Sequence, residues 1–359
     1  MKIAFDATAL YGRFGGIENA LWHTFSHLRA LDGENQYLVF VPRDAPAPPP
    51  PHNPRWEWRR LPFEGRDKAR RIFWQQIELP LTLRREKCDL LHAWNYVAPL
   101  ACPVPFVLTV QDLIALNRPR FAARFNRAHY RAVMPRSLKL AARVIVTAEQ
   151  TRREVLQRAP DAQVRVIPLG VEPQFFETLS PSQIEAVRAQ YALPPRYLLY
   201  VGNFEPKKNL PNLLRALEML PDAPPLVVAG GIKPWAGFEQ LLSKAKKIGF
   251  VQRDELPALY AGCAVFCFPS LAEGFGLPIL EALACGAPVL ASTAVPLPHL
   301  ESVAALAHPR FARSIAEHLD VLLNAEASPQ MAQPSRDYAR RFSWEGAARA
   351  TLDVYREFR

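Results

Sequence analysis

The sequence predicts an α/β protein built from two doubly wound, Rossmann-like domains. The chain has 359 residues, more than the roughly 250–300 at which a single hydrophobic core stops growing. Short apolar runs with the length of buried strands alternate with segments of helical periodicity. This alternation stops in the proline-punctuated residues 171–195 and then restarts. We therefore expect a first domain over residues 1–172 and a second over residues 173–344.

The composition is that of a soluble globular chain, with 49% hydrophobic and 22% charged residues. No run of about 18 apolar residues is present, so no membrane-spanning helix is expected. The apolar part of the N-terminus is too short for a signal peptide and is typical of a first strand. Five cysteines lie in or beside apolar segments without metal-ligand spacing, which predicts reduced core thiols in a cytoplasmic protein.

The first domain is expected to begin with a strand at residues 2–6, a glycine-containing turn and a helix. Gly15 and Gly16 lie in that turn, and the apolar residues after it recur at helical spacing. A strand, a glycine turn and a helix N-terminus together form an anion-binding cradle, to which Arg13 would add a cation. A dinucleotide site is the rival interpretation, but the spacing is not G-x-G-x-x-G. Further strands are expected at residues 37–42, 89–92, 105–110, 144–146 and 163–169.

Polar side chains follow two of these strands at their carboxyl ends. His92 and Asn95 come at and after the strand 89–92, and Gln111 and Asp112 follow the strand 105–110. Ligands of open α/β sheets collect at the carboxyl ends of the strands. These residues are therefore candidates for ligand contact.

Two basic segments of the first domain accompany a net charge of +10. Residues 66–85 are basic on one side and apolar on the other, and residues 118–143 are rich in arginine. One interpretation of 66–85 is an ordinary amphipathic surface helix, broken near Pro80. The other is contact with an anionic membrane surface, for which Phe73 and Trp74 are suited. The charge also suits an anionic substrate, whereas nucleic acid would account for none of the motifs and is not expected as a partner.

The second domain repeats the alternation of strands and helices. Its first strand, residues 197–201, is followed by a loop that contains Lys207 and Lys208. A solvated turn is the simpler interpretation of the two lysines, but their place after a strand that ends in Gly202 favours contact with phosphate. Further strands are expected at residues 225–229, 249–251, 264–268 and up to residue 290.

Residues 268–290 carry the most informative motif of the chain. Gly274 and Gly276 let the backbone approach a ligand closely, and Pro278 suits the first turn of a helix. The start of that helix is an anion site, and Glu273 and Glu281 beside it can accept hydrogen bonds from sugar hydroxyls. A surface loop with two solvated glutamates is the alternative. A phosphate site beside two carboxylates predicts a nucleotide sugar as the ligand.

This stretch resembles the donor-site motif of the retaining GT-B glycosyltransferases of family 4, the glycosyl transferases group 1, which include bacterial mannosyltransferases. The resemblance covers nearly the whole chain and is strongest over residues 197–290. It implies two Rossmann-like domains that face each other across a cleft, with the acceptor-side domain first and the donor-binding domain second. It also implies that a last helix, residues 345–359, packs back on the first domain.

The resemblance assigns roles to residues of this sequence. It implies that Glu273 meets the transferred sugar, that Glu281 binds the ribose diol, and that Lys208 meets the diphosphate. The catalytic residues that it implies are Glu273, Gln111 and Lys208. The implied donor-binding residues are Gly15, Gly16, Gly202, Asn203, Lys207, Lys208, Phe250, Val251, Glu273, Gly274, Phe275, Gly276, Leu277 and Glu281. The implied acceptor residues are Arg13, His92, Asn95 and Asp112.

Two positions depart from the family pattern. Gln111 stands where the family has a histidine that contacts the donor sugar, and glutamine can hydrogen bond but cannot become a cation. Asn203 stands where many members have an arginine for the diphosphate, a role that Lys207 or Arg13 would have to fill.

The function implied is retaining transfer of a hexose-like sugar from a GDP- or UDP-sugar to a glycan or lipid-linked acceptor, in the synthesis of bacterial polysaccharide or lipopolysaccharide. No metal or other cofactor is expected, because the chain has no Asp-x-Asp triplet and Lys208 can neutralise the leaving diphosphate. The expected location is the cytoplasm. The basic segments of the first domain add peripheral attachment to the inner face of the plasma membrane as a further hypothesis. A nucleotide-sugar epimerase of the same fold and a catalytically weak nucleotide-sugar binder remain the alternatives.

Overall fold

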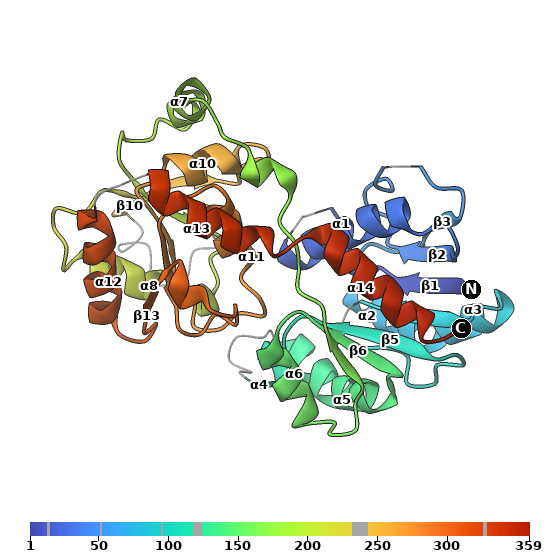
Figure 1. Cartoon of the computed structure of the whole chain (residues 1–359). Coiled ribbons are helices and arrows are strands. Elements are labelled where there is room, and N and C mark those ends of the chain that lie inside the picture. The colour runs from blue at the N-terminus through green and yellow to red at the C-terminus, as the bar shows by residue number, and fades with distance from the viewer. Residues whose placement is uncertain (13–14, 51, 95, 118–123, 232–242, 326–328) are drawn as a thin grey trace. The chain divides into compact units, whose positions relative to one another are not determined.

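The computed structural model describes residues 1–359 except 13–14, 51, 95, 118–123, 232–242 and 326–328. The chain forms two compact units. Unit 1 consists of Met1–Gly170 and Trp344–Arg359, and unit 2 of Val171–Ser343. Each unit is built on a sheet of parallel strands (Figure 1).

Unit 1 contains a seven-stranded sheet in the order β3-β2-β1-β4-β5-β6-β7. The order reverses between β1 and β4, which is the doubly wound arrangement expected from the sequence. The central strands are buried, because helices cover a parallel sheet on both faces. The strands are β1 (Lys2–Asp6), β2 (Gln36–Val41), β3 (Trp56–Arg60), β4 (Leu90–Ala93), β5 (Phe106–Val110), β6 (Arg143–Val146) and β7 (Val164–Val166). The helices are α1 (Gly16–Leu31), α2 (Lys68–Phe73), the π-helix η1 (Trp74–Glu78), α3 (Leu79–Arg85), α4 (Ile114–Asn117), α5 (Arg124–Leu140), α6 (Glu149–Leu156) and α14 (Trp344–Arg356).

Unit 2 contains a six-stranded sheet in the order β10-β9-β8-β11-β12-β13, which again reverses, here between β8 and β11. The strands are β8 (Leu198–Val201), β9 (Leu226–Ala229), β10 (Ala245–Gly249), β11 (Val265–Phe268), β12 (Val289–Ser292) and β13 (Ala305–Ala307). The helical elements are η3 (Pro173–Phe176), α7 (Pro181–Gln190), η4 (Pro206–Lys208), α8 (Leu210–Leu217), α10 (Leu256–Gly262), α11 (Leu277–Ala284), η5 (Leu300–Ser302), α12 (Ala312–Asn324) and α13 (Pro329–Arg340).

The last helix, α14, packs on the first unit beside α1 (Figure 1). Its Tyr355 is fully buried, with its hydroxyl 2.5 Å from Nδ1 of His92, while the Thr109 hydroxyl lies 2.7 Å from Nε2 of the same ring. Burial lowers the pKa of His92 to about 3, so the imidazole is neutral and serves both hydroxyls. These contacts tie α14 to the strands β4 and β5.

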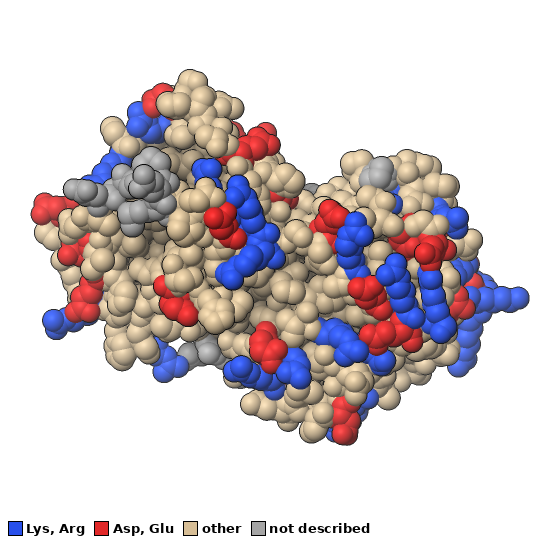
Figure 2. Space-filling view, viewed as in Figure 1, with Lys and Arg blue, Asp and Glu red and all other residues tan. Residues whose placement is uncertain are grey.

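Acidic and basic side chains are mixed over the face of unit 1 that carries α14 (Figure 2). Two ion pairs along the helix account for part of this pattern: Arg349 with Glu345 at 2.6 Å and Arg356 with Asp353 at 2.7 Å. A surface that binds nucleic acid has a field of one sign. This face therefore gives no support to nucleic acid as a partner.

Residues 68–85 form one continuous helical run, so the predicted break at Pro80 is wrong. The helix continues through Pro80, whose missing N–H interrupts the hydrogen-bond ladder, and the irregularity is the π-helical turn η1 directly before α3. The wider turn places consecutive residues on the inner side: Trp74 is buried, and Gln75 donates to the Asp6 carboxylate at 2.6 Å. Gln76 donates to the carbonyl of Ala98 at 3.2 Å.

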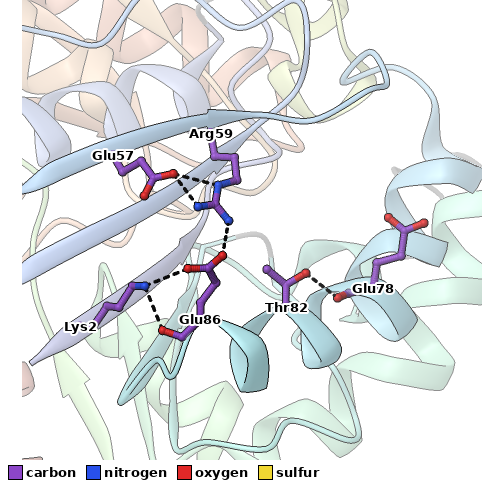
Figure 3. Close-up of polar contacts among 6 residues, drawn as sticks. All are labelled: Lys2, Glu57, Arg59, Glu78, Thr82 and Glu86. Atoms are coloured by element: carbon purple, nitrogen blue, oxygen red, sulfur yellow. Dashed lines mark hydrogen bonds and ion pairs between the residues drawn. The ribbon is translucent and has the colours of Figure 1, made fainter.

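The carboxyl end of this run is fastened to the sheet through Glu86 (Figure 3). Lys2 of β1 lies 2.9 Å from the Glu86 carboxylate, and Arg59 of β3 lies 2.8 Å from its other oxygen. Hydrogen bonds from these two cations hold the pKa of Glu86 at about 2. A charge-assisted network therefore fixes which side of the helical run faces solvent.

Several other elements differ from the sequence-based expectation or were not part of it. The strand expected at 249–251 ends at Gly249 and is β10, and residues 250–251 follow it as a loop. The crossover at 171–195 contains η3 and α7, the latter started by a capping box of Ser180 and Gln183. The strands β3 and β13 and the helix α13 had no clear periodic signal and were not predicted. No helix among the described residues is long and apolar enough to cross a bilayer.

Candidate functional site

The turn between β11 and α11 has the strand–loop–helix form expected of an anion site. Gly276 caps α11 with φ 113°, and a Cβ there would lie 3.0 Å from the Val295 side chain. Only glycine adopts this conformation without strain. Pro278 lies in the first turn of the helix, one position later than expected. The turn thus leads from the buried strand β11 directly into the amide groups at the start of α11.

Lys208 and Glu273 meet at the mouth of this turn. The ammonium of Lys208 lies 2.9 Å from Glu273 Oε1 and 4.5 Å from the centroid of the Phe268 ring. The Lys208 side chain is 15% exposed and that of Glu273 is 9% exposed. Burial opposes ionisation of Glu273, but Lys208 and Lys207 outweigh it, so the pKa of Glu273 lies below its usual range. The structure therefore brings a cation and an ionised carboxylate together in the loops before α11.

Backbone contacts explain why the lysine loop meets the glutamate loop. Asn209 adopts a left-handed conformation with φ 60°, and its side-chain Nδ2 donates to the backbone carbonyls of Pro269 at 2.9 Å and Pro309 at 2.6 Å. The amide of Leu271 donates to the carbonyl of Lys207 at 2.6 Å. At Gly230, with φ 129°, a Cβ would lie 2.3 Å from the Gly202 carbonyl. Asn209 thus links the two loops, and Gly230 lets the end of β9 approach Gly202 at the start of the lysine loop.

Glu281 lies in a second polar cluster of unit 2. One of its oxygens accepts from Nη2 of Arg253 at 2.6 Å, and the other accepts from the hydroxyl of Tyr260 at 3.1 Å. Arg253 also donates from Nε and Nη2 to the two oxygens of Glu172, at 2.8 and 2.7 Å. Burial opposes the charge of Arg253, but Glu281 and Glu172 outweigh it and raise its pKa.

No motif of the sequence predicts this cluster. Arg253 follows Val251 by two residues in a loop, and no spacing rule links it to Glu281 or to Glu172. Only the fold brings together residues that are 28 and 81 positions apart from Arg253.

The other predicted donor residues of unit 2 lie in the loops around these two clusters. Phe250 is 67% exposed, whereas Val251 is buried. The carbonyl of Gly249 before them accepts from the amide of Gly230 at 2.6 Å, which joins this loop to the end of β9. Asn203 is exposed at the start of the lysine loop, and Phe275 and Leu277 are buried on either side of Gly276.

In unit 1, Gly15 caps α1, and a Cβ at Gly15 or at Gly16 would meet no atom within 4 Å. The start of α1 is therefore open at these two glycines. Arg13 and Asn95 lie outside the described residues.

The remaining predicted residues of unit 1 are His92, Asp112 and Gln111. His92 is fully buried, and both of its ring nitrogens are engaged by hydroxyls, which favours a structural role. Asp112 is partly exposed and oriented by the amide of Ile114, which donates to it at 2.9 Å. Gln111 is 9% exposed, and its Nε2 is buried without a hydrogen-bond partner among the described residues. An unmet buried donor is costly unless a ligand satisfies it.

Among the described residues, no group of three or more His, Cys, Asp or Glu side chains could hold a metal ion. The charged groups that the site offers are therefore the Lys208–Glu273 pair and the Arg253 cluster. The pair offers a cation beside backbone amides for an anion, and the cluster offers carboxylate oxygens for hydroxyl groups.

Comparisons with known proteins cover both units. Residues 183–341 match the family model Glycosyl transferases group 1, and residues 14–175 match the family model Glycosyltransferase Family 4. The chain is 29% identical to O-antigen chain mannosyltransferase B of Escherichia coli over 76% of each chain. It is 32% identical to D-inositol 3-phosphate glycosyltransferase of Saccharomonospora viridis over 75% of this chain and 70% of that protein.

Two solved structures show the same fold. Sucrose-phosphate synthase from Thermosynechococcus elongatus has a TM-score of 0.79 and 22% identity, with 99% of this chain and 98% of that chain covered. Anabaena HepE, solved in complex with UDP-glucose, has a TM-score of 0.74 and 19% identity, with 99% and 100% covered. The predicted pair of doubly wound domains is thus confirmed.

Proposed function

The chain belongs to the family 4 glycosyltransferases, the glycosyl transferases group 1, and from this premise we propose that it transfers a hexose from a nucleoside diphosphate sugar to a glycan or lipid-linked acceptor. The observation that carries the proposal is the Lys208–Glu273 pair at the start of α11. A largely buried cation, paired with a residue of the turn that leads into a helix N-terminus, suits a diphosphate, and the carboxylate beside it suits the hydroxyls of the sugar.

In the proposed reaction, the bond between the anomeric carbon and the diphosphate oxygen breaks, and the acceptor hydroxyl forms the new bond on the same face of the sugar. The proton of that hydroxyl passes to the departing phosphate. Lys208 stabilises the charge that develops on the leaving group, a contribution that is large in a site that excludes water. Glu273 orients the sugar, and the proposed reaction uses no metal and no other cofactor.

Support for the choice of substrates comes from the similar proteins. The matched Escherichia coli protein is a mannosyltransferase of the O-antigen chain, and the HepE structure holds UDP-glucose. A UDP- or GDP-hexose donor and a role in the synthesis of surface polysaccharide follow as proposals for this chain. The proposed location is the cytoplasm, where such donors are made.

The test is incubation with UDP- and GDP-hexoses in the presence of a chelator, with analysis of the sugar and nucleotide products. A transferase without its acceptor is expected to release nucleoside diphosphate slowly. Appearance of a different nucleotide sugar would identify an epimerase instead. If calorimetry detects binding of a nucleotide sugar but no product forms, even after acceptor fractions are added, the protein is a nucleotide-sugar binder.

Gln111 is expected to contribute a neutral hydrogen bond to the donor sugar. Its buried Nε2 has a free N–H donor, and glutamine does not titrate. Gln111→Ala should lower kcat by about tenfold, as for loss of one neutral hydrogen bond. Gln111→His should be tolerated, and the pH profile of the native enzyme should show no ionisation near 6.5 that disappears in Gln111→Ala. A gain of several orders of magnitude in Gln111→His would show that the native residue does not support catalysis, and would favour the binder.

We further propose that unit 1 docks on an anionic membrane through the helical run 68–85. Phe73, Ile77 and Leu81 follow one another at four-residue spacing along this run and are 48%, 52% and 60% exposed. Residues four apart lie on one face of a helix, so the three side chains form an apolar row. Trp74, which the sequence favoured for membrane contact, is buried and packs on Phe40 instead.

Two neighbouring segments carry further exposed leucines. Leu100 is 37% exposed, and its amide donates to Gln76 of η1 at 3.1 Å. Leu140, at the end of α5, is also exposed, and α5 reaches the same segment through Ser137, whose hydroxyl accepts from the amide of Ala98 at 3.1 Å.

Exposed cations lie at both ends of the run, so the row suits an anionic surface more than a neutral one. Basic side chains project at the end of unit 1 where α3 lies (Figure 2). Each basic residue near an anionic bilayer contributes about 1 kcal/mol. The exposed cations of the run and its flanks are Arg66, Arg70, Arg84, Arg85 and Lys87, of which Arg70 also pairs with Glu78.

Flotation with vesicles tests this surface. The native protein should be recovered with phosphatidylglycerol-containing vesicles at low salt and much less with phosphatidylcholine vesicles. The triple change Phe73→Ser, Ile77→Ser, Leu81→Ser and the double change Arg84→Glu, Arg85→Glu should each reduce recovery severalfold. Val321→Ser, at an equally exposed apolar residue of unit 2, is the matched control. Equal recovery with both vesicle types, or an unchanged triple variant, would contradict the proposal.

A further inference from the structure

Arg253 has no assigned role, yet it connects the carboxylate that is predicted to bind ribose with the first residues of unit 2. Its guanidinium binds Glu172 through two parallel hydrogen bonds and Glu281 through a third. The guanidinium also lies over the ring of Phe175, whose centroid is 4.7 Å from the guanidinium carbon. The planar guanidinium is thereby fixed on three sides, which a flexible ammonium would not be.

The hydrogen bonds of Glu281 leave a defined capacity for a ligand. A carboxylate has about four lone-pair positions, two on each oxygen. Arg253 occupies one position on one oxygen, and Tyr260 occupies one on the other. Each oxygen therefore keeps one acceptor position, and the two hydroxyls of a ribose diol need two.

Glu281 could not hold this orientation by itself. It is 2% exposed, on the buried helix α11, so it has almost no water to satisfy its charge. The charged and titratable groups around it are Arg253, Tyr260, Cys285 and, through Arg253, Glu172. Among these neighbours, Arg253 supplies the positive charge that bonds directly to the carboxylate.

We propose that Arg253 is a positioning residue, which holds Glu281 so that its two remaining acceptor positions meet the ribose diol of the nucleotide, while Glu172 anchors Arg253. This inference rests on the proposed function, since it takes a nucleoside diphosphate as the ligand. It adds that recognition of the ribose depends on a chain of contacts that begins outside the donor motif, at Glu172.

The consequence is a loss of affinity that depends on the diol. Arg253→Gln should raise the Kd for UDP or GDP, whichever the native protein binds, by about tenfold or more, as for loss of a hydrogen bond to a charged group. The same substitution should leave the Kd for the 2′,3′-dideoxy analogue within about twofold of the native value, because that analogue has no hydroxyl for Glu281 to accept. Arg253→Lys should recover only part of the loss, because one ammonium cannot reproduce the two parallel bonds to Glu172.

The experiment measures Kd by calorimetry for the ribonucleotide and its dideoxy analogue on the full chain, with thermal unfolding recorded for every variant. In a double-mutant cycle, Arg253→Gln should have little further effect once Glu281→Gln is present. Glu172→Gln leaves the Arg253–Glu281 contact in place, so it should weaken binding of the ribonucleotide less, again with little effect on the dideoxy analogue. This variant takes the place of Arg253→Gln in the test if Arg253→Gln does not fold. Arg313→Gln, at an exposed arginine that pairs with Glu317 at 3.0 Å, is the matched control.

Equal losses for the ribonucleotide and the dideoxy analogue would overturn the inference and would indicate that Arg253 contacts another part of the ligand or only supports the fold. Full additivity in the double-mutant cycle would overturn it as well. Native protein that bound neither UDP nor GDP would overturn the proposed function and this inference together, whereas native binding with a diol-independent effect would remove the inference alone.

Discussion

Lys208→Ala is expected to lower turnover by about 10²–10³-fold, the range for removing one group that stabilises charge in a transition state. Lys208 provides the buried ammonium at the start of α11, 15% exposed and 2.9 Å from Glu273. Its loss should weaken the binding of a nucleoside diphosphate far more than that of the nucleoside, because only the former carries the compensating charge. Calorimetry with the two ligands and a donor hydrolysis assay measure both effects.

The same substitution has a second effect, on stability, that must be separated from the first. The folded-state pKa of Glu273 lies below the unfolded value, so the pair stabilises the fold above the unfolded pKa and loses this contribution as the pH falls through the folded one. At pH 7, Lys208→Ala should therefore lower the free energy of unfolding by about 3 kcal/mol or less, since the pair is not fully buried.

A second substitution distinguishes the two roles. In Lys208→Ala, Glu273→Gln, the buried carboxylate is neutralised, so stability should recover while affinity for the diphosphate should not. Lys244→Ala, at an exposed lysine that pairs with Glu218 at 2.6 Å, is the matched control for loss of a lysine. Equal losses for nucleoside and nucleoside diphosphate in Lys208→Ala would remove Lys208 from the anion site.

Glu281→Ala is expected to weaken nucleotide binding by about 1–3 kcal/mol, or roughly 5- to 150-fold in Kd. The lost contact is with the ribose, so the nucleoside and the nucleoside diphosphate should be affected equally, in contrast to Lys208→Ala. Arg253 keeps its two bonds to Glu172 in this variant, so it is not left as an unpaired charge. Titration calorimetry on a variant shown to be folded measures the change.

The control for this change is Glu317→Ala, which removes an exposed glutamate from α12 of the same unit. Its nucleotide affinity should equal that of the native protein. An unchanged affinity in Glu281→Ala would instead leave Glu281 as a buried partner of Arg253 and Tyr260 with no role in binding the nucleotide.

Much of the fold was predictable because its strands are short apolar runs between glycines and prolines. The runs at 2–6, 105–110 and 197–201 were found because a strand buried on both faces has a nearly continuous apolar sequence. The strand β3 was missed because its sequence, WEWRR, is half charged and lies at the edge of its sheet. The π-helical turn at Trp74 was missed as well, because contacts with residues far away in the sequence draw Trp74, Gln75 and Gln76 inward there.

The donor motif was readable from the sequence because its parts are local. Gly276, Pro278 and Glu281 lie within one turn and one helix, where backbone conformation and spacing fix their arrangement. The orientation of the helical run 68–85 could not be predicted from the local sequence. Its amphipathic pattern predicted a surface helix, but the packing of Trp74 on Phe40 and the hydrogen bond from Gln75 to Asp6 decide that Trp74 is buried while Phe73 faces solvent.

By itself, the sequence determined the fold class, the family and the glycine turn that leads into α11, since each depends on patterns within a few turns of chain. Only the tertiary structure decided which partners the motif residues have. Lys208 and Glu273 are 65 positions apart and meet because the neighbouring parallel strands β8 and β11 deliver their following loops to the same edge of one sheet. Arg253 and Glu172 are 81 positions apart, and they meet because the fold brings the segment that leads from β7 into unit 2 against the loop after β10. The physical reason is that an ion pair depends on distance in space, which a linear sequence fixes only for near neighbours.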